Sequence, residues 1–201
     1  MIDTNHYGPW AVIAGGSEGV GSAFADSLAQ ANSYGHEFVT GELDKVQGVI
    51  DLNITRQLEL AQHFGAKMKE RGRGGIMLLG SLAGYMGSEQ QSIYGAAKAF
   101  SRVFAEGLWL ELKPFGVHVV ELVLGVTRTP AMERAGLRFD IPGLNVAEAE
   151  DVAREGLDHL ADGPVWIAGG NYKAAQQRSG FPRDVMVQAA ADGMRKLLGR
   201  Q

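Results

Sequence analysis

Tyr94 and Lys98 lie four residues apart in the stretch Tyr94-Gly95-Ala96-Ala97-Lys98. Residues at this spacing stack on one face of an α-helix, so the phenol and the ammonium are expected to be neighbours. A cation beside a phenol stabilises the phenolate, and about 1.4 kcal/mol of interaction lowers the tyrosine pKa by one unit. The pair therefore predicts a tyrosine that transfers protons. The alternative is a solvated Tyr–Lys pair, which by itself is the commoner arrangement.

Two further polar residues stand where they could join this chemistry. Ser81 follows the apolar run 76–79, and a hydroxyl at the carboxyl end of a parallel strand faces the ligand crevice and can donate to an oxyanion. A capping or turn serine is the alternative. Asn53 stands inside a helical stretch, where an amide is locally unfavourable. It predicts a helix bend at which a water binds a freed carbonyl, or else a plain exposed asparagine.

Residues 15–21 read Gly-Gly-Ser-Glu-Gly-Val-Gly between a predicted strand and a predicted helix. In that context the backbone N–H groups and the helix N-terminus can hold a pyrophosphate. The alternative is an ordinary tight strand–helix turn.

The elements that must position these residues alternate along the chain. Continuous apolar runs predict buried strands, and 3.6-residue periodicity with Gly and Pro boundaries predicts helices. The strands are expected at 10–14, 76–79, 117–124 and 165–168, the helices at 20–31, 44–71, 92–112, 149–160 and 182–198, and an irregular segment at 128–150. This alternation predicts an α/β fold with a doubly wound parallel sheet, and 201 residues suit a single domain over 1–201.

Composition excludes several classes of function. The net charge of −4 and the isoelectric point near 5.7 argue against a general nucleic-acid binder. The absence of cysteine excludes disulfides and thiolate metal sites, and fits a reducing, cytoplasmic location. The N-terminal residues do not read as a signal peptide, and no apolar run is long enough to span a membrane. The five histidines are widely separated, so no metal site is expected.

The order of these motifs identifies the family. The segments GGSEGVG, DLNIT, GGIMLLGSLAGYMG, YGAAKAF and LGVTRTP together resemble the short-chain dehydrogenase/reductase family over most of the chain. The resemblance implies a Rossmann-like fold and an NAD(P)-dependent oxidoreductase that interconverts a carbonyl and an alcohol by hydride transfer. The alternative is a non-catalytic nucleotide-sensing or scaffold protein with the same fold.

The resemblance also implies roles for individual residues. Tyr94 would be the general acid and base, Lys98 would lower the pKa of Tyr94 and bind the nicotinamide ribose, Ser81 would hold the substrate oxygen, and Asn53 would anchor a water linked to Lys98. Segments matching the family's cofactor contacts contain Gly15, Ser17, Glu18, Gly19, Val20, Gly21, Gly125, Thr127 and Thr129. The family usually has Pro-Gly where this chain has Leu124-Gly125. The choice between NAD and NADP is not readable.

Substrate and partners follow from the same resemblance. Residues 130–150 correspond to the family's substrate lid, and Tyr85, Met86 and Met132 are expected to face a fairly apolar small-molecule carbonyl or alcohol. Residues 55–71 and 92–112 resemble helices that pair across subunits, which implies a homodimer or homotetramer. No nucleic-acid or membrane partner is expected.

The family pattern is interrupted near Ala31 and Asn32. Related proteins have three further strands and two helices there, roughly 60 residues by ordinary element lengths, and this chain lacks the second to fourth strands. The family's fourth strand lies between the first and the fifth, so the strands at 10–14 and 76–79 are expected to lack a partner. Each orphan backbone group would cost about 1–3 kcal/mol. Our hypothesis is that the chain joins two pieces of a longer protein; the alternative is a true deletion.

Overall fold

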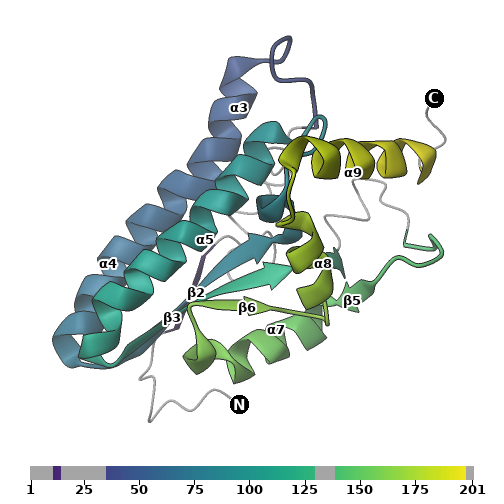
Figure 1. Ribbon diagram of the computed structural model, residues 1–201. Coiled ribbons are helices and arrows are strands. Elements are labelled where there is room, and N and C mark those ends of the chain that lie inside the picture. The colour runs from purple at the N-terminus through teal and green to yellow at the C-terminus, as the bar shows by residue number, and fades with distance from the viewer. Residues whose placement is uncertain (1–10, 15–34, 130–138, 198–201) are drawn as a thin grey trace.

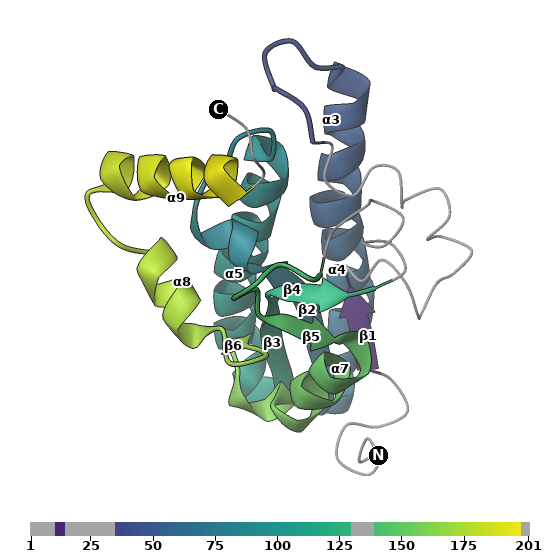
Figure 2. The same cartoon turned by 90° about the vertical axis from the view of Figure 1, so that its right-hand side faces the viewer.

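The computed structural model describes residues 11–14, 35–129 and 139–197. At its centre is a four-stranded parallel sheet with strand order β1-β2-β3-β6 (Figure 1). The strands are β1 (Ala11–Ala14), β2 (Gly74–Ser81), β3 (Val117–Leu124) and β6 (Val165–Ile167). Helices cover both faces of this sheet (Figures 1 and 2). The predicted α/β class and doubly wound parallel sheet are confirmed.

The helices on one face form two long rods that run parallel to each other (Figure 1). The first rod is continuous and consists of α3 (Leu43–Ile50), a π-helical turn η1 (Asp51–Thr55) and α4 (Arg56–Arg71). It ends at Gly72, whose φ of 71° is the left-handed conformation that glycine adopts without steric cost. The second rod is α5 (Ser92–Leu112). On the opposite face lies α7 (Ala149–Asp158) (Figure 1).

Alternation of side chains along the strands builds a separate core on each face. Ile76 and Leu78 of β2 point toward α4 and α5, whereas Met77 between them points toward α7. The buried cluster under α4 and α5 contains Met68, Ile76, Leu78, Ala105, Leu112, Val117 and Val119. The cluster on the α7 side contains Met77, Val120, Leu122, Val152, Leu160 and Ala168. These two cores fix the sheet beneath the elements that carry the polar residues.

The first strand does not lack a partner, so that expectation was wrong. β1 pairs directly with β2, and Ala11 lies opposite Gly75 and Ala14 opposite Leu78. The position that the family resemblance gives to another strand is therefore occupied by β1 itself, and the backbone groups along this boundary are paired. The junction near Ala31 and Asn32 lies outside the described residues, and the origin of the interruption stays a hypothesis.

Several short elements were not predicted. Within the segment expected to be irregular, β4 (Val126–Arg128) and β5 (Val146–Glu148) form a small parallel sheet. Three-residue strands are too short to show a period in the sequence. The helix α8 (Tyr172–Arg178) was also missed. The short 3-10 turns are η2 (Leu82–Tyr85), η3 (Lys113–Phe115) and η4 (Leu160–Asp162).

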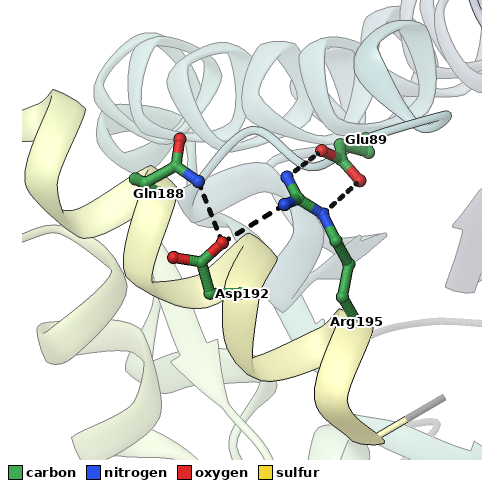
Figure 3. A network of polar contacts seen from close by, with 4 residues as sticks. All are labelled: Glu89, Gln188, Asp192 and Arg195. Atoms are coloured by element: carbon green, nitrogen blue, oxygen red, sulfur yellow. Dashed lines mark hydrogen bonds and ion pairs between the residues drawn. The ribbon is translucent and has the colours of Figure 1, made fainter. Parts of the chain in front are cut away.

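The last described helix, α9 (Arg183–Leu197), confirms the predicted terminal helix and is tied to the loop before α5. The guanidinium of Arg195 donates to both carboxylate oxygens of Glu89, at 2.6 Å and 3.4 Å, and to Asp192 at 3.3 Å (Figure 3). Gln188 donates to the same Asp192 oxygen at 2.9 Å. These contacts join segments that are about a hundred positions apart in the chain.

Candidate active site

Ser81 is the last residue of β2, at the carboxyl end of a central strand. Its hydroxyl oxygen accepts a hydrogen bond from the backbone N–H of Ala83 at 3.2 Å, so it also caps the η2 turn. Ser81 lies opposite Leu124, the last residue of β3. Because parallel strands end at the same edge, this is the edge at which open α/β sheets bind ligands. The capping role and the predicted site role of Ser81 are therefore compatible.

Tyr94, in the first turn of α5, meets Ser81 at this edge. Burial raises the pKa of Tyr94, and a side-chain hydrogen bond with Ser81 lowers it by a smaller amount. The net direction is upward, opposite to the lowering expected from Lys98, because lost hydration of the phenolate outweighs the hydrogen bond. The phenol is thus protonated at neutral pH, as a group that donates a proton must be.

Lys98 lies one turn further along α5 and is only 4% exposed. Its Nζ donates to the carbonyl oxygen of Leu79 at 2.9 Å and lies 5.6 Å from the centre of the Tyr94 ring. Burial lowers the pKa of Lys98 to about 8, and the attraction of Glu121 partly offsets this. The structure places Ser81, Tyr94 and Lys98 together at this edge, and their roles in a reaction stay predictions.

Asn53 lies in the π-helical turn that joins α3 to α4, and it is buried. Its Nδ2 donates to the carbonyl oxygen of Val49 at 3.0 Å. A single π-helical turn within an α-helix is a common feature of functional sites, and it frees backbone groups from the regular ladder. The predicted irregularity of the helix at Asn53 is confirmed, whereas the water-anchoring role stays a prediction.

Sequence reasoning missed Glu121, a buried carboxylic acid in β3 that acts electrostatically on Lys98. Burial raises its pKa to about 8, while Arg102 and Lys98 lower it. The available signal was a lone carboxylate inside the apolar run VHVVELVL. A charged residue in a strand buried on both faces needs a partner, and that partner could have been sought on the neighbouring helix.

The predicted cofactor segments leave the sheet at the same edge. Gly15, Ser17, Glu18, Gly19, Val20 and Gly21 lie outside the described residues, but β1 ends at Ala14, immediately before them. Gly125 follows β3, and a Cβ there would lie 2.5 Å from Nδ2 of Asn171. Thr127 is buried in β4 and donates to the Gly125 carbonyl at 3.4 Å, and Thr129 is half-buried just after β4.

The donor set at this edge suits a nicotinamide dinucleotide. The ammonium of Lys98 has three N–H donors, and the bond to Leu79 accounts for one of them. The others can bind ribose hydroxyls, while Ser81 and Tyr94 present hydroxyls to an oxygen of a second ligand. The residues present therefore fit a dinucleotide beside a carbonyl or alcohol.

The predicted substrate residues lie partly elsewhere. Tyr85 and Met86 are half-buried and line a cavity of about 540 Å³ between η2, α5 and the turn at 179–183. Ser81, Tyr94 and Lys98 are not part of its lining. Met132 lies outside the described residues. The assignment of these residues to a substrate stays a prediction.

In the part of the chain that the structure describes, no group of three or more His, Cys, Asp or Glu side chains is arranged to hold a metal ion. No helix among the same residues combines the length and apolar character needed to cross a membrane.

Comparison with known proteins decides the family. The family described as short chain dehydrogenase matches residues 31–138, more than half of the chain. The protein belongs to the short-chain dehydrogenase/reductase family. The match includes the segments that carry Asn53, Ser81, Tyr94 and Lys98. The predicted family is thus confirmed, and its members are NAD(P)-dependent oxidoreductases; the choice between NAD and NADP is open.

This chain matches only part of the length of each curated relative. The human 17-beta-hydroxysteroid dehydrogenase type 1 is 35% identical over 91 residues, 45% of this chain and 28% of the relative. A very-long-chain 3-oxoacyl-CoA reductase of Ajellomyces capsulatus is 29% identical over 142 residues, 71% of this chain and 40% of the relative. The chain thus spans well under two thirds of these curated relatives.

Solved structures confirm the fold. A short-chain dehydrogenase from Sphingobium yanoikuyae in complex with NADPH has a TM-score of 0.61 at 30% identity, and the match covers 83% of this chain and 61% of that one. A 7beta-hydroxysteroid dehydrogenase structure has a TM-score of 0.68 at 23% identity, covering 78% and 62% respectively. The second likeness concerns the fold alone.

Proposed function

We propose that the protein interconverts a small-molecule carbonyl compound and an alcohol, with Tyr94 transferring the proton. The single observation that carries the proposal is that Tyr94 and Lys98, one helical turn apart in α5, lie beside Ser81 at the carboxyl end of β2. This is the arrangement that acid catalysis at a carbonyl oxygen requires, because both hydroxyl groups can reach the same atom.

Lys98 would hold the ribose of a nicotinamide dinucleotide, and in the direction of reduction that cofactor would supply the hydride for the carbonyl carbon. The Ser81 hydroxyl donates a hydrogen bond to the carbonyl oxygen, and Tyr94 gives that oxygen its proton. The charge of Lys98 stabilises the phenolate that remains until a proton returns from solvent. Oxidation of the alcohol runs through the same groups in reverse.

The proposal includes a homodimer or homotetramer. The outer face of α5 carries exposed apolar side chains, with Val103 63% and Leu110 66% exposed. A hollow of about 290 Å³ on this face is lined by Phe100, Val103, Phe104, Gly107, Leu108 and Glu111. This surface supports the predicted pairing of helices between subunits.

The proposed location remains cytoplasmic, and the net charge of −4 supports the absence of nucleic acid as a partner.

The test is the Tyr94→Phe variant, compared with Tyr172→Phe as a matched control. Tyr172 is a tyrosine of α8 that is 61% exposed. Consumption of NADH and of NADPH is followed against a panel of aliphatic and cyclic ketones. Because a positioned general acid contributes about 10²–10⁴-fold, Tyr94→Phe should lose at least that much turnover, while cofactor affinity and the Tyr172→Phe activity stay unchanged. Activity of Tyr94→Phe within threefold of the parent would remove Tyr94 from the reaction. Tight cofactor binding without turnover of any compound would favour the nucleotide-sensing alternative.

A further inference from the structure

Glu121 is a carboxylic acid in the middle of β3, and only 1% of its surface is exposed. Its neighbours along the strand are apolar: Val119, Val120, Leu122 and Val123. Its Oε2 atom has no hydrogen-bond partner among the described residues. A buried polar atom without a partner costs about 1–3 kcal/mol, and both protonation of the carboxyl group and nearby cations offset this cost.

The side chain of Glu121 lies on the same face of the sheet as α5. Val117 and Val119, at alternate positions of the same strand, belong to the core beneath that helix. The carboxyl group occupies the space beside Gly80, where a Cβ would lie 2.5 Å from Cδ of Glu121. It thus lies against β2 one residue before Ser81.

Lys98 reaches the same point of β2 from the helix side. Its Nζ donates to the carbonyl oxygen of Leu79, the residue that precedes Gly80. The ammonium and the carboxyl group are therefore held against consecutive residues of one strand. Both are almost fully buried, so little solvent screens their interaction.

Four charged or titratable groups surround Glu121. Arg102 and Lys98 of α5 attract its carboxylate, and Glu106 of the same helix repels it. The charge of Glu121 also contributes to raising the pKa of Tyr85 in η2. Burial brings the pKa of the carboxyl group up to about 8 and that of Lys98 down to about 8. The two groups consequently exchange protons with solvent in the same pH range and titrate as a coupled pair.

We propose that Glu121 is a positioning residue for Lys98: its carboxylate, once ionised, keeps the buried ammonium charged and held against the end of β2. Removing the carboxylate leaves Lys98 in the same dry environment, beside Arg102, with its main attractive partner gone. Lys98 then gives up its proton at lower pH. The stabilisation of the Tyr94 phenolate by Lys98, a role that rests on the proposed function, is then lost at lower pH as well.

The direct test is a titration of Lys98 in the full chain. Lysine is labelled with ¹³C at the ε carbon, and the Lys98 resonance is assigned by its loss in Lys98→Met. Glu121→Gln keeps the shape of the side chain and removes its charge, and Glu106→Gln, an exposed acid on the same helix, is the control. We expect the pKa of Lys98 to fall by about one unit or more in Glu121→Gln and to stay within about 0.3 units in Glu106→Gln. Identical Lys98 titrations in folded parent and Glu121→Gln proteins would overturn the proposal.

A reciprocal measurement covers the case in which Glu121→Gln fails to fold. Coupling between two sites is symmetric, so loss of the ammonium must raise the pKa of Glu121. Infrared spectra of Lys98→Met should show the protonated carboxyl band persisting to higher pH than in the parent. A band that disappears at the same pH in both proteins contradicts the proposal.

Kinetics then separate this inference from the proposed function. If the protein turns over a ketone, the alkaline limb of its kcat/KM profile should move to lower pH in Glu121→Gln, while cofactor affinity at pH 7 is unchanged. A complete lack of turnover would count against the proposed function, yet the two spectroscopic titrations would still decide whether Glu121 controls Lys98.

Discussion

Glu121 and Glu89 are both carboxylates beside cationic side chains, and their surroundings move their pKa values in opposite directions. Glu89 lies on the surface, where the guanidinium of Arg195 binds both of its oxygens and lowers its pKa (Figure 3). Glu121 lies under α5 near two cations, and its pKa nevertheless rises to about 8 because burial removes the hydration of the charged form. The position in the fold, more than the identity of the neighbours, decides the ionisation of a carboxyl group here.

The comparison also shows what each pair contributes. An exposed ion pair is screened by water and salt, so Glu89 and Arg195 join α9 to the loop before α5 with little net stabilisation. A buried acid beside a buried amine is costly to hold and titrates near neutral pH, which is the range in which enzymes need proton-transferring groups.

Charge reversal should give the largest contrast between the two places. Glu121→Lys puts a third cation beside Lys98 and Arg102 in a dry site, and removal of one partner from a buried charge cluster costs about 3–5 kcal/mol. We expect chemical denaturation to show a loss of this size or a failure to fold. Glu89→Lys, beside Arg195, should leave the unfolding free energy unchanged within experimental error. Comparable losses in both variants would mean that burial does not distinguish the two sites.

The pH dependence of stability should run in opposite directions at the two carboxylates. Glu121 has a folded-state pKa of about 8 against 4.5 as the reference value. The folded state therefore binds a proton that the unfolded state has lost, and this stabilisation falls away as pH rises from about 4.5 to 8, by on the order of 5 kcal/mol. The unfolding free energy of the parent should therefore fall relative to that of Glu121→Gln as pH rises over that range.

Glu89 gives the opposite sign. Its pKa is lowered in the fold, so its stabilisation is present above the unfolded-state value and is lost as pH falls through the folded-state pKa. Glu89→Gln should differ from the parent least in acid. Urea melts from pH 3.5 to 8 on the three proteins measure both trends, and parallel curves for all three would contradict the assigned environments.

Adding a methyl group at a glycine should change stability in opposite directions at the packed site and on the open surface of α9, with a smaller effect than charge reversal. Gly80→Ala forces a Cβ onto the carboxyl group of Glu121, and overpacking of this kind costs about 1–3 kcal/mol. Gly193→Ala, in α9, meets nothing within 4 Å and should stabilise the helix by about 0.5–1 kcal/mol. Thermal denaturation gives both values. If Gly80→Ala were as stable as the parent, the carboxyl group would not occupy the space beside Gly80.

The sequence alone determined the alternation of strands and helices and the residues that meet at the site. Ser81, Tyr94 and Lys98 could be predicted because they depend on local rules, namely helical spacing and position at a strand end. The short strands β4 and β5 and the helix α8 could not, because three to seven residues carry too little periodic signal.

Tertiary structure alone decided the pairing of β1 with β2 and the environment of Glu121. Strand order depends on contacts between residues 60 or more positions apart, and no local pattern encodes which strand fills a given place in the sheet. The pKa of a side chain depends on the solvent and charges around it, which the fold brings together from β2, β3 and α5. The sequence therefore supplied the chemical groups, and the packing of α5 on the sheet set their charge.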